Sequence, residues 1–235
     1  MSETKTTKIN FVLGLFVGMA VLSTVAFLIL LVVVFSGKQE VNLAANAEEI
    51  QAPAEQPEPV SATPVSPIKD GESFKGGENA TVSIIEYTDF ECPYCLRHHE
   101  TINQVIDAYG NKIKYVLRHF PLGFHADAQK AAEAFECAAE QGKAYEMSDA
   151  IFKANGNKDM SVLALKTAAA NLGMNSSNFN DCLDSDKYAG KVQQDALEGS
   201  AAGVDGTPAT FVNGQLVSGA LPFESFEQII DQLLK

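Results

Sequence analysis

The chain has 235 residues, with 30 acidic side chains against 17 basic ones and a formal net charge of −13. This acidic balance repels the phosphate backbone of nucleic acids, so no nucleic-acid partner is expected. Since domains usually hold about 100 to 200 residues, a chain of this length divides naturally into one membrane segment and one compact domain.

The N-terminal part contains an uncharged, largely apolar stretch from Ile9 to Gly37. It is longer than the ~20 residues that a helix needs to cross a bilayer, and longer than the roughly 7 to 15 apolar residues of a cleaved secretory signal. Residues 9–36 are therefore predicted to be an uncleaved transmembrane signal anchor, with cleavage as the less favoured alternative. Two lysines, Lys5 and Lys8, precede the stretch, and one, Lys38, follows it. Because positive charge favours the cytoplasmic side, residues 1–8 are expected in the cytoplasm and the rest of the chain in the periplasm or at the cell surface.

Residues 37–75 are rich in Ala, Glu, Gln, Pro and Ser. Such a composition buries too little apolar surface to offset the loss of chain entropy, and its prolines favour extended backbone. The segment is predicted to be a disordered linker that joins the membrane anchor to a folded domain at 76–235. It contains no candidate for a folded dimerisation module.

The folded domain is predicted to begin with a strand, a helix and a second strand. Val82, Ile84 and Tyr87 belong to a stretch with apolar groups on both faces, as in a central strand covered on both sides. Apolar residues at helical spacing follow, and Gly110 ends this helix. A second strand, KIKYVLRHF, stops before Pro121. This βαβ order favours a parallel strand pair joined by a crossover helix.

Residues 125–203 are predicted to form an inserted helical region of about four helices. Strand character returns at ATFV, and the Asn213-Gly214 dipeptide then predicts a tight hairpin to QLVS. Pro222 suits the first turn of a final helix with one apolar face. The predicted fold class is therefore α/β, in the order βαβ, helical insert, ββα.

A Cys92-Pro93-Tyr94-Cys95 motif lies where the first strand gives way to the helix. Unpaired amide groups and the helix dipole at such positions lower the pKa of a thiol from ~8.5 to between roughly 3.5 and 7.5. Cys92 is therefore the candidate nucleophile, and Cys95 is the candidate resolving thiol that closes a disulfide with it. This redox chemistry requires no cofactor.

A Cys-x-x-Cys pair can also provide two of the four ligands of a zinc ion, which is the alternative interpretation of the motif. Zinc needs two further ligands, normally a second such pair or a suitably spaced pair of histidines. His98 and His99 follow closely, but a helix directs their side chains away from a shared tetrahedron with both thiols. No metal site is therefore expected.

From about Gly77 to the C-terminus the chain resembles the DsbA-like family of exported thioredoxin-fold proteins, in particular the membrane-tethered members with a helical insert. The resemblance rests on EYTDFECPYC, on HFPLGFHADAQKAAEAFECAAEQGKAYEMSDAIF and on GVDGTPATFVNG. It implies a thioredoxin fold and a cis peptide bond at Thr207-Pro208 that faces the active site. A plain proline at the start of a strand is the alternative, because X-Pro bonds are cis in only ~5 to 6% of cases.

Glu86 shares strand parity with Val82 and Ile84, so its side chain is expected to point into the core. A buried carboxylate can exchange protons with the resolving thiol through water, and the resemblance supports this relay role. An exposed strand residue is the alternative. The resemblance also implies a structural disulfide between Cys137 and Cys182, in keeping with an oxidising compartment, while redox activity of this second pair is less favoured.

Other polar residues near the motif are assigned structural roles. His125 is expected at a helix entry or in a packing position. Four more are expected to be mainly solvated, with adjustment of the charge around the thiolate as the alternative: Asp89, Glu91, Arg118 and His119.

These observations and the resemblance predict an extracytoplasmic thiol:disulfide oxidoreductase. The preferred direction is that of a dithiol oxidase, which introduces disulfides into exported cysteine-containing proteins through a mixed disulfide at Cys92. A reductase or isomerase of the same fold is the alternative, since Thr207 before the proline is shared with reductive members. A non-catalytic tethered binding domain is a third hypothesis. An oxidase must be reoxidised, and the resemblance implies a membrane partner of the DsbB or VKOR type.

Overall fold

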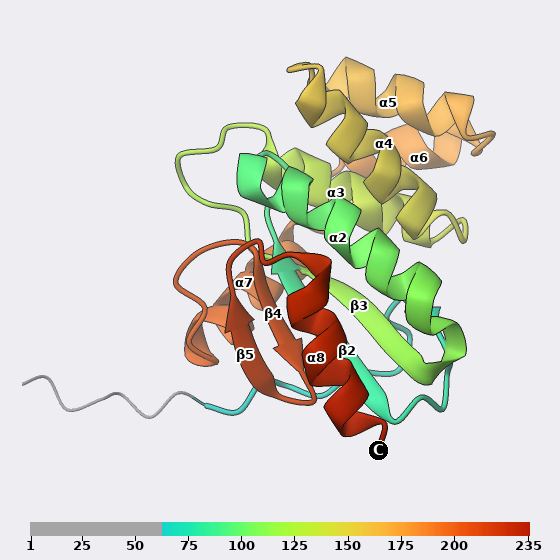
Figure 1. Cartoon of the computed structure of the whole chain (residues 1–235). Helices are drawn as coiled ribbons and strands as arrows, with labels where there is room; N and C mark the ends of the chain where they lie inside the picture. Colours follow the sequence, from blue (N-terminus) through green and yellow to red (C-terminus); the bar gives the residue numbers. More distant parts are fainter. Residues whose placement is uncertain (1–62) are drawn as a thin grey trace, which may run out of the picture. The chain divides into compact units, whose positions relative to one another are not determined.

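The computed structural model describes residues 63–235 (Figure 1). The expected cytoplasmic segment at 1–8, the membrane anchor at 9–36 and the linker up to residue 62 lie outside the described part. Among the helices of residues 63–235, none is long and apolar enough to cross a membrane.

A five-stranded mixed sheet forms the centre of the domain, in the order β1-β3-β2-β4-β5. The central strand β2 (Val82–Thr88) is parallel to β3 (Ile113–His119) and antiparallel to β4 (Ala209–Val212). Two short strands, β1 (Phe74–Gly76) and β5 (Gln215–Ser218), form the antiparallel edges. The two central strands are buried on both faces, which explains why each has apolar residues on both faces.

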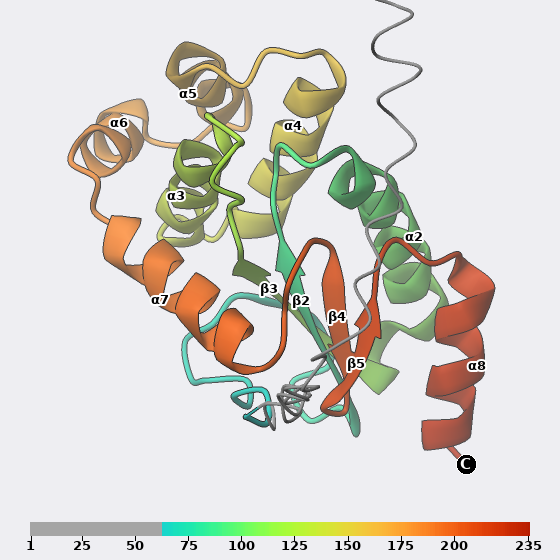
Figure 2. The ribbon, with the colours of Figure 1, turned by 90° about the vertical axis from the view of Figure 1, so that its left-hand side faces the viewer.

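Helices cover both faces of this sheet (Figure 2). On one face lie α2 (Pro93–Tyr109), followed by the short 3-10 helix η1 (Gly110–Lys112), and α8 (Phe223–Leu233). The opposite face carries α7 (Ala189–Ala201), which approaches the sheet so closely that a Cβ at Gly199 would lie 2.8 Å from the Tyr87 ring. The expected α/β class and the order βαβ, insert, ββα are confirmed, with β1 as an additional edge strand.

The helical insert contains five helices rather than about four. Its members are α3 (Ala128–Ala139), α4 (Ala144–Gly156), α5 (Val162–Asn171), α6 (Ser176–Asp184) and α7. The sequence of α6 has nine residues, most of them polar, so it offers few apolar positions from which to predict a separate helix. Its start is fixed instead by the Asn175 side chain, which accepts a hydrogen bond from the Asn178 amide.

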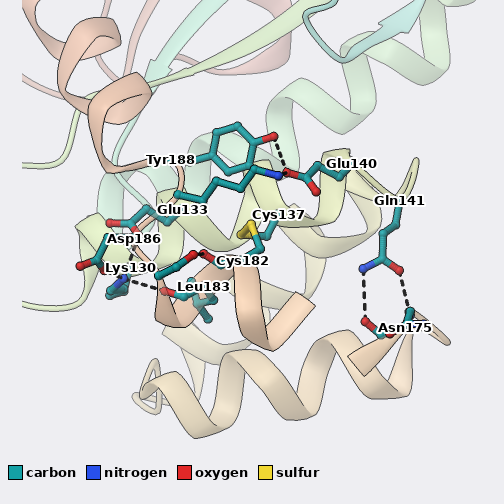
Figure 3. Close-up of a disulfide and its surroundings, with 12 residues drawn as sticks. Lys130, Glu133, Cys137, Glu140, Gln141, Asn175, Cys182, Leu183, Asp186 and Tyr188 are labelled. Atoms are coloured by element: carbon teal, nitrogen blue, oxygen red, sulfur yellow. Dashed lines mark hydrogen bonds and ion pairs between the residues drawn. A yellow bond between two sulfur atoms is a disulfide. The ribbon is translucent and has the colours of Figure 1, made fainter. Parts of the chain in front are cut away.

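A disulfide between Cys137 on α3 and Cys182 on α6 cross-links the insert (Figure 3). Beside it, Asn175 N–H donates to Gln141 Oε1 at 2.8 Å, and Gln141 Nε2 donates to the Asn175 carbonyl at 3.3 Å. The Tyr188 hydroxyl donates to a carboxylate oxygen of Glu140 at 2.6 Å and so attaches the start of α7 to α3. Covalent and polar links therefore join helices that are distant in sequence.

Residues 63–73, called the strap below, pack against the domain although the sequence placed them in the linker. The Thr63 amide donates to the Ala201 carbonyl at 2.9 Å, and Val65 and Ile68 pack against the apolar cluster around Tyr87. The folded part therefore begins before the expected boundary at residue 75.

The strap is held chiefly by Arg118 of β3, which was expected to be solvated but is fully buried. Its Nε and Nη2 donate to the two carboxylate oxygens of Glu72 at 2.8 and 3.0 Å. Its Nη1 and Nη2 also donate to the carbonyls of Ser66 and Pro67 at 2.8 and 2.7 Å. Backbone carbonyls and one carboxylate supply most of the polar anchors of this segment, beside the apolar contacts of Val65 and Ile68, so its composition gave little sign of order.

Candidate redox site

The cysteine pair lies at the carboxyl end of β2, where α2 begins. Cys92 is the N-cap residue with extended backbone, and Pro93 is the first helical residue, where its missing N–H costs nothing. Cys95 lies one turn further on and is 0% exposed, whereas Cys92 retains 3% exposure. Both are free thiols in this structure.

The surroundings of Cys92 favour its ionised form. Its pKa is lowered to about 5, first because the Cys95 thiol donates a hydrogen bond to its sulfur, with further contributions from the Cys95 and Tyr94 amides and from Thr207. Burial opposes this effect. A thiol with such a pKa is mostly ionised at neutral pH, so the Cys92 sulfur is present mainly as a thiolate.

Cys95 behaves in the opposite way. Burial raises its pKa, and the neighbouring Cys92 and the charge of Glu86 raise it further. The backbone N–H of Asp89 points at the Cys95 sulfur, 3.5 Å away. One thiol of the pair is therefore ionised at neutral pH while the other keeps its proton.

A cluster of buried polar side chains lies on the sheet beneath α2. Glu86 is buried, as its strand parity indicated, and its Oε2 accepts a hydrogen bond from the Tyr115 hydroxyl at 2.7 Å. Thr210 of β4 is its cross-strand neighbour. The Nε2 of His98, one turn after Cys95, lies 3.0 Å from Thr210 Oγ1. Burial lowers the pKa of His98, so its imidazole is neutral.

The loop before β4 forms the other wall of the site. The peptide bond between Thr207 and Pro208 is cis, and the Thr207 carbonyl oxygen lies 3.6 Å from Cys92 Sγ. The buried Thr207 side chain also helps to lower the pKa of Cys92. The loop thus places backbone and hydroxyl groups of Thr207 beside the Cys92 sulfur.

Asp89 was expected to be solvated, but it is 1% exposed and accepts four hydrogen bonds. Its Oδ1 accepts from the amides of Glu91 at 2.7 Å and Cys92 at 3.2 Å. Its Oδ2 accepts from the Leu122 amide at 2.7 Å and from His125 Nδ1 at 2.8 Å. His125, expected at a helix entry, is thus bonded to the turn that carries Cys92. Two of these partners, Leu122 and His125, lie more than 30 positions away from Asp89, so a local sequence pattern cannot show them.

His119 was also expected to be solvated and is fully buried, with its Nε2 2.8 Å from Glu136 Oε1. Within residues 63–235, His119, Glu136 and Asp195 form the group whose side-chain atoms are spaced as metal ligands. Lys191 already pairs with both carboxylates, at 3.0 Å from Glu136 and 2.8 Å from Asp195. An ammonium group therefore supplies the positive charge that these acids require.

The family described as thioredoxin matches residues 69–232. Among solved structures, the chain is similar to the thiol-disulfide exchange protein alpha-DsbA2 from Wolbachia pipientis. The two share 25% identity with a TM-score of 0.60, and the match covers 69% of this chain and 87% of that one. Oxidised BdbD from Bacillus subtilis has the same fold at 18% identity, with a TM-score of 0.64 over 74% of this chain and 98% of that one.

The curated relatives include proteins named Na(+)/H(+) antiporter, namely NhaA 3 of Salinispora tropica (34% identical) and NhaA 1 of Mycolicibacterium vanbaalenii (35% identical). These matches cover 71% and 67% of this chain but 25% and 26% of those proteins, so the chain spans about a quarter of their length. The family match covers most of this chain and includes every element of the sheet. The chain therefore belongs to the thioredoxin family, and it shares its fold with DsbA-like thiol-disulfide oxidoreductases.

Proposed function

We propose that the protein is an extracytoplasmic dithiol oxidase, which introduces disulfides into exported cysteine-containing proteins. The observation that carries the proposal is the contrast between the acidic Cys92 and the buried Cys95, which keeps its proton. A stabilised thiolate favours the reduced form of the pair, so the oxidised form is a strong oxidant.

Oxidation of a substrate takes two thiol-disulfide exchanges. In the first, a substrate thiolate attacks the sulfur of Cys92 in the Cys92–Cys95 disulfide and forms a mixed disulfide. The electron pair of the broken bond goes to Cys95, which then takes up a proton. In the second, another substrate thiolate attacks the substrate sulfur of the mixed disulfide, the substrate disulfide forms, and Cys92 leaves as a thiolate. Its low pKa makes Cys92 a good leaving group in this second step.

Two further residues serve this cycle in the proposal. Glu86 exchanges protons with Cys95 through water, taking up a proton from solvent before it passes one on, since it is buried and its charge acts on that thiol. The Thr207 backbone, next to Cys92 Sγ, pairs with an extended substrate segment and brings the substrate sulfur to the nucleophile.

The proposed function also includes a cellular location and a redox partner. The apolar stretch at 9–36 would attach the domain to the outer side of the cell membrane, and a membrane reoxidase of the DsbB or VKOR type would restore the disulfide after each turnover. The support for both is the amino-acid sequence and its family resemblance.

The reduction potential of the full chain in detergent, equilibrated against glutathione, tests the direction. An oxidase requires a potential far above the approximately −270 mV of thioredoxin. A potential near that value would refute the oxidase and support the reductase alternative, which Thr207 before the proline favours.

The reoxidation of reduced ribonuclease tests catalysis itself. The Cys92→Ser variant should lose this activity because no mixed disulfide can form. If wild-type protein showed no activity above the variant, a non-catalytic binding domain would replace the enzyme.

A further inference from the structure

The side chain of Asp89 joins the turn that carries Cys92 to the loop at residues 120–127. It lies three residues before Cys92, and its backbone N–H points at the Cys95 sulfur. Its carboxylate bonds the Glu91 and Cys92 amides on one side and the Leu122 amide and His125 on the other. A single buried residue thus contacts both cysteines and the neighbouring loop.

All four partners of this carboxylate are N–H donors, which matches the four lone-pair directions of an ionised carboxylate. A buried negative charge is costly unless it is hydrogen-bonded and compensated. The group bonded to it that can carry a positive charge is His125, whose side chain is 16% exposed.

Other charges near this pair belong to the same turn and loop. The Glu91 carboxylate accepts a hydrogen bond from the Asp127 amide at 2.7 Å. Lys158, which follows α4, lines a surface pocket together with Glu91 and Asp127 and faces these two acids. They are accessible to solvent, which screens them, whereas the Asp89 carboxylate lies in the protein interior and is bonded to the Cys92 amide.

We propose that Asp89 and His125 form a positioning pair, which fixes the Cys92 turn against the 120–127 loop and balances the charge beside the Cys92 sulfur. The Asp89 carboxylate opposes a second negative charge on Cys92, and a protonated His125 offsets it. The inference deepens the proposed function, because it rests on Cys92 as the reactive thiolate.

The two members of the pair can be tested by substitutions with opposite expected effects on Cys92. Asp89→Asn keeps the shape but removes the charge, and its amide nitrogen cannot accept from the two donors it faces. The Cys92 pKa should fall by about one unit, since a negative charge that is hydrogen-bonded to the Cys92 amide is removed. His125→Gln removes the compensating charge, so the Cys92 pKa should rise by about half a unit. In the double variant it should return toward the wild-type value.

The thiolate absorbance of the reduced full chain at 240 nm, titrated with pH in detergent, measures each change. Glu72→Gln is the matched control, because Glu72 is a partly buried carboxylate that also accepts several hydrogen bonds, but it lies in the strap and bonds Arg118. It should lower the melting temperature and leave the Cys92 titration unchanged.

An Asp89→Asn variant that melts earlier but titrates like wild type would reduce Asp89 to a structural residue and overturn the inference. If Asp89→Asn does not fold, His125→Gln decides, since an unchanged Cys92 pKa there overturns the charge balance. An ordinary thiol pKa for Cys92 in the wild-type chain would instead contradict the proposed function itself.

Discussion

Replacing Cys137 and Cys182 together with alanine removes the cross-link between α3 and α6 and leaves Cys92 and Cys95 as the remaining cysteines of the chain. No incorrect disulfide can then form between the two pairs. The bond closes a loop with a sequence separation of 45. On the chain-entropy account, loss of a loop of this size lowers the free energy of unfolding by about 4 kcal/mol.

A change of this size is readily measured. For a domain of 150 to 250 residues, 1 kcal/mol corresponds to about 2 to 4 °C, so the melting temperature should fall by roughly 8 to 16 °C. Circular dichroism under oxidising conditions measures this fall, and reoxidation of reduced ribonuclease measures activity on the same samples. Activity below the melting transition should stay within about twofold of wild type, because the disulfide has no part in the exchange steps.

Gln141→Ala is the control, since it removes the two hydrogen bonds between Gln141 and Asn175 in the same region but keeps the disulfide. This substitution should lower the free energy of unfolding by about 1 kcal/mol. If the double cysteine variant melted no earlier than this control, loop closure would not be the source of its stabilisation. If the variant stayed folded but lost disulfide exchange, the second pair would take part in the chemistry.

Three further substitutions test other parts of the structure. Arg118→Met leaves Glu72 buried without its counter-charge and should lower the unfolding free energy in urea by about 3 to 5 kcal/mol; a loss below about 1 kcal/mol would contradict the role given to this pair. Burial lowers the pKa of His98, so below about pH 6.5 the unfolded chain binds a proton at this residue that the folded chain excludes. The free energy of unfolding is therefore unaffected by protonation of His98 above that pH and decreases as the pH falls below it. His98→Gln should make the free energy of unfolding vary less between pH 7.5 and 5. Equal slopes for the variant and the wild type would show that His98 is not the cause of the variation. Glu86→Gln should slow exchange at least about tenfold in stopped-flow measurements, and an unaltered rate would remove Glu86 from the mechanism.

The elements that the sequence predicted well are those whose own residues determine them. β2 is apolar on both faces because both are covered, and Cys92 lies at the expected junction because Pro93 can start a helix. The hairpin between β4 and β5 turns at Asn213 and Gly214, both with positive φ, as the dipeptide indicated. Glu86 is buried as expected, but both faces of β2 are covered, so parity determined only the face on which its side chain lies.

The polar residues that the sequence misassigned are those whose environment depends on distant partners. Asp89 and His125 are 36 positions apart, and Arg118 and Glu72 are 46 apart. An isolated charged residue is usually solvated, so Asp89 and Arg118 were placed at the surface. Burial becomes favourable once the fold supplies a complete set of donors or acceptors, and no local pattern records that set.

The strap also decides where a shortened gene for crystallography or NMR should start. A fragment cut at residue 76, where the composition changes, would lack Glu72 and the carbonyls of Ser66 and Pro67 that accept from Arg118. The guanidinium would then face the interior with no acceptor from this segment, and such truncated protein would be prone to aggregation or degradation. Expression plasmids should therefore retain Thr63 and some residues before it.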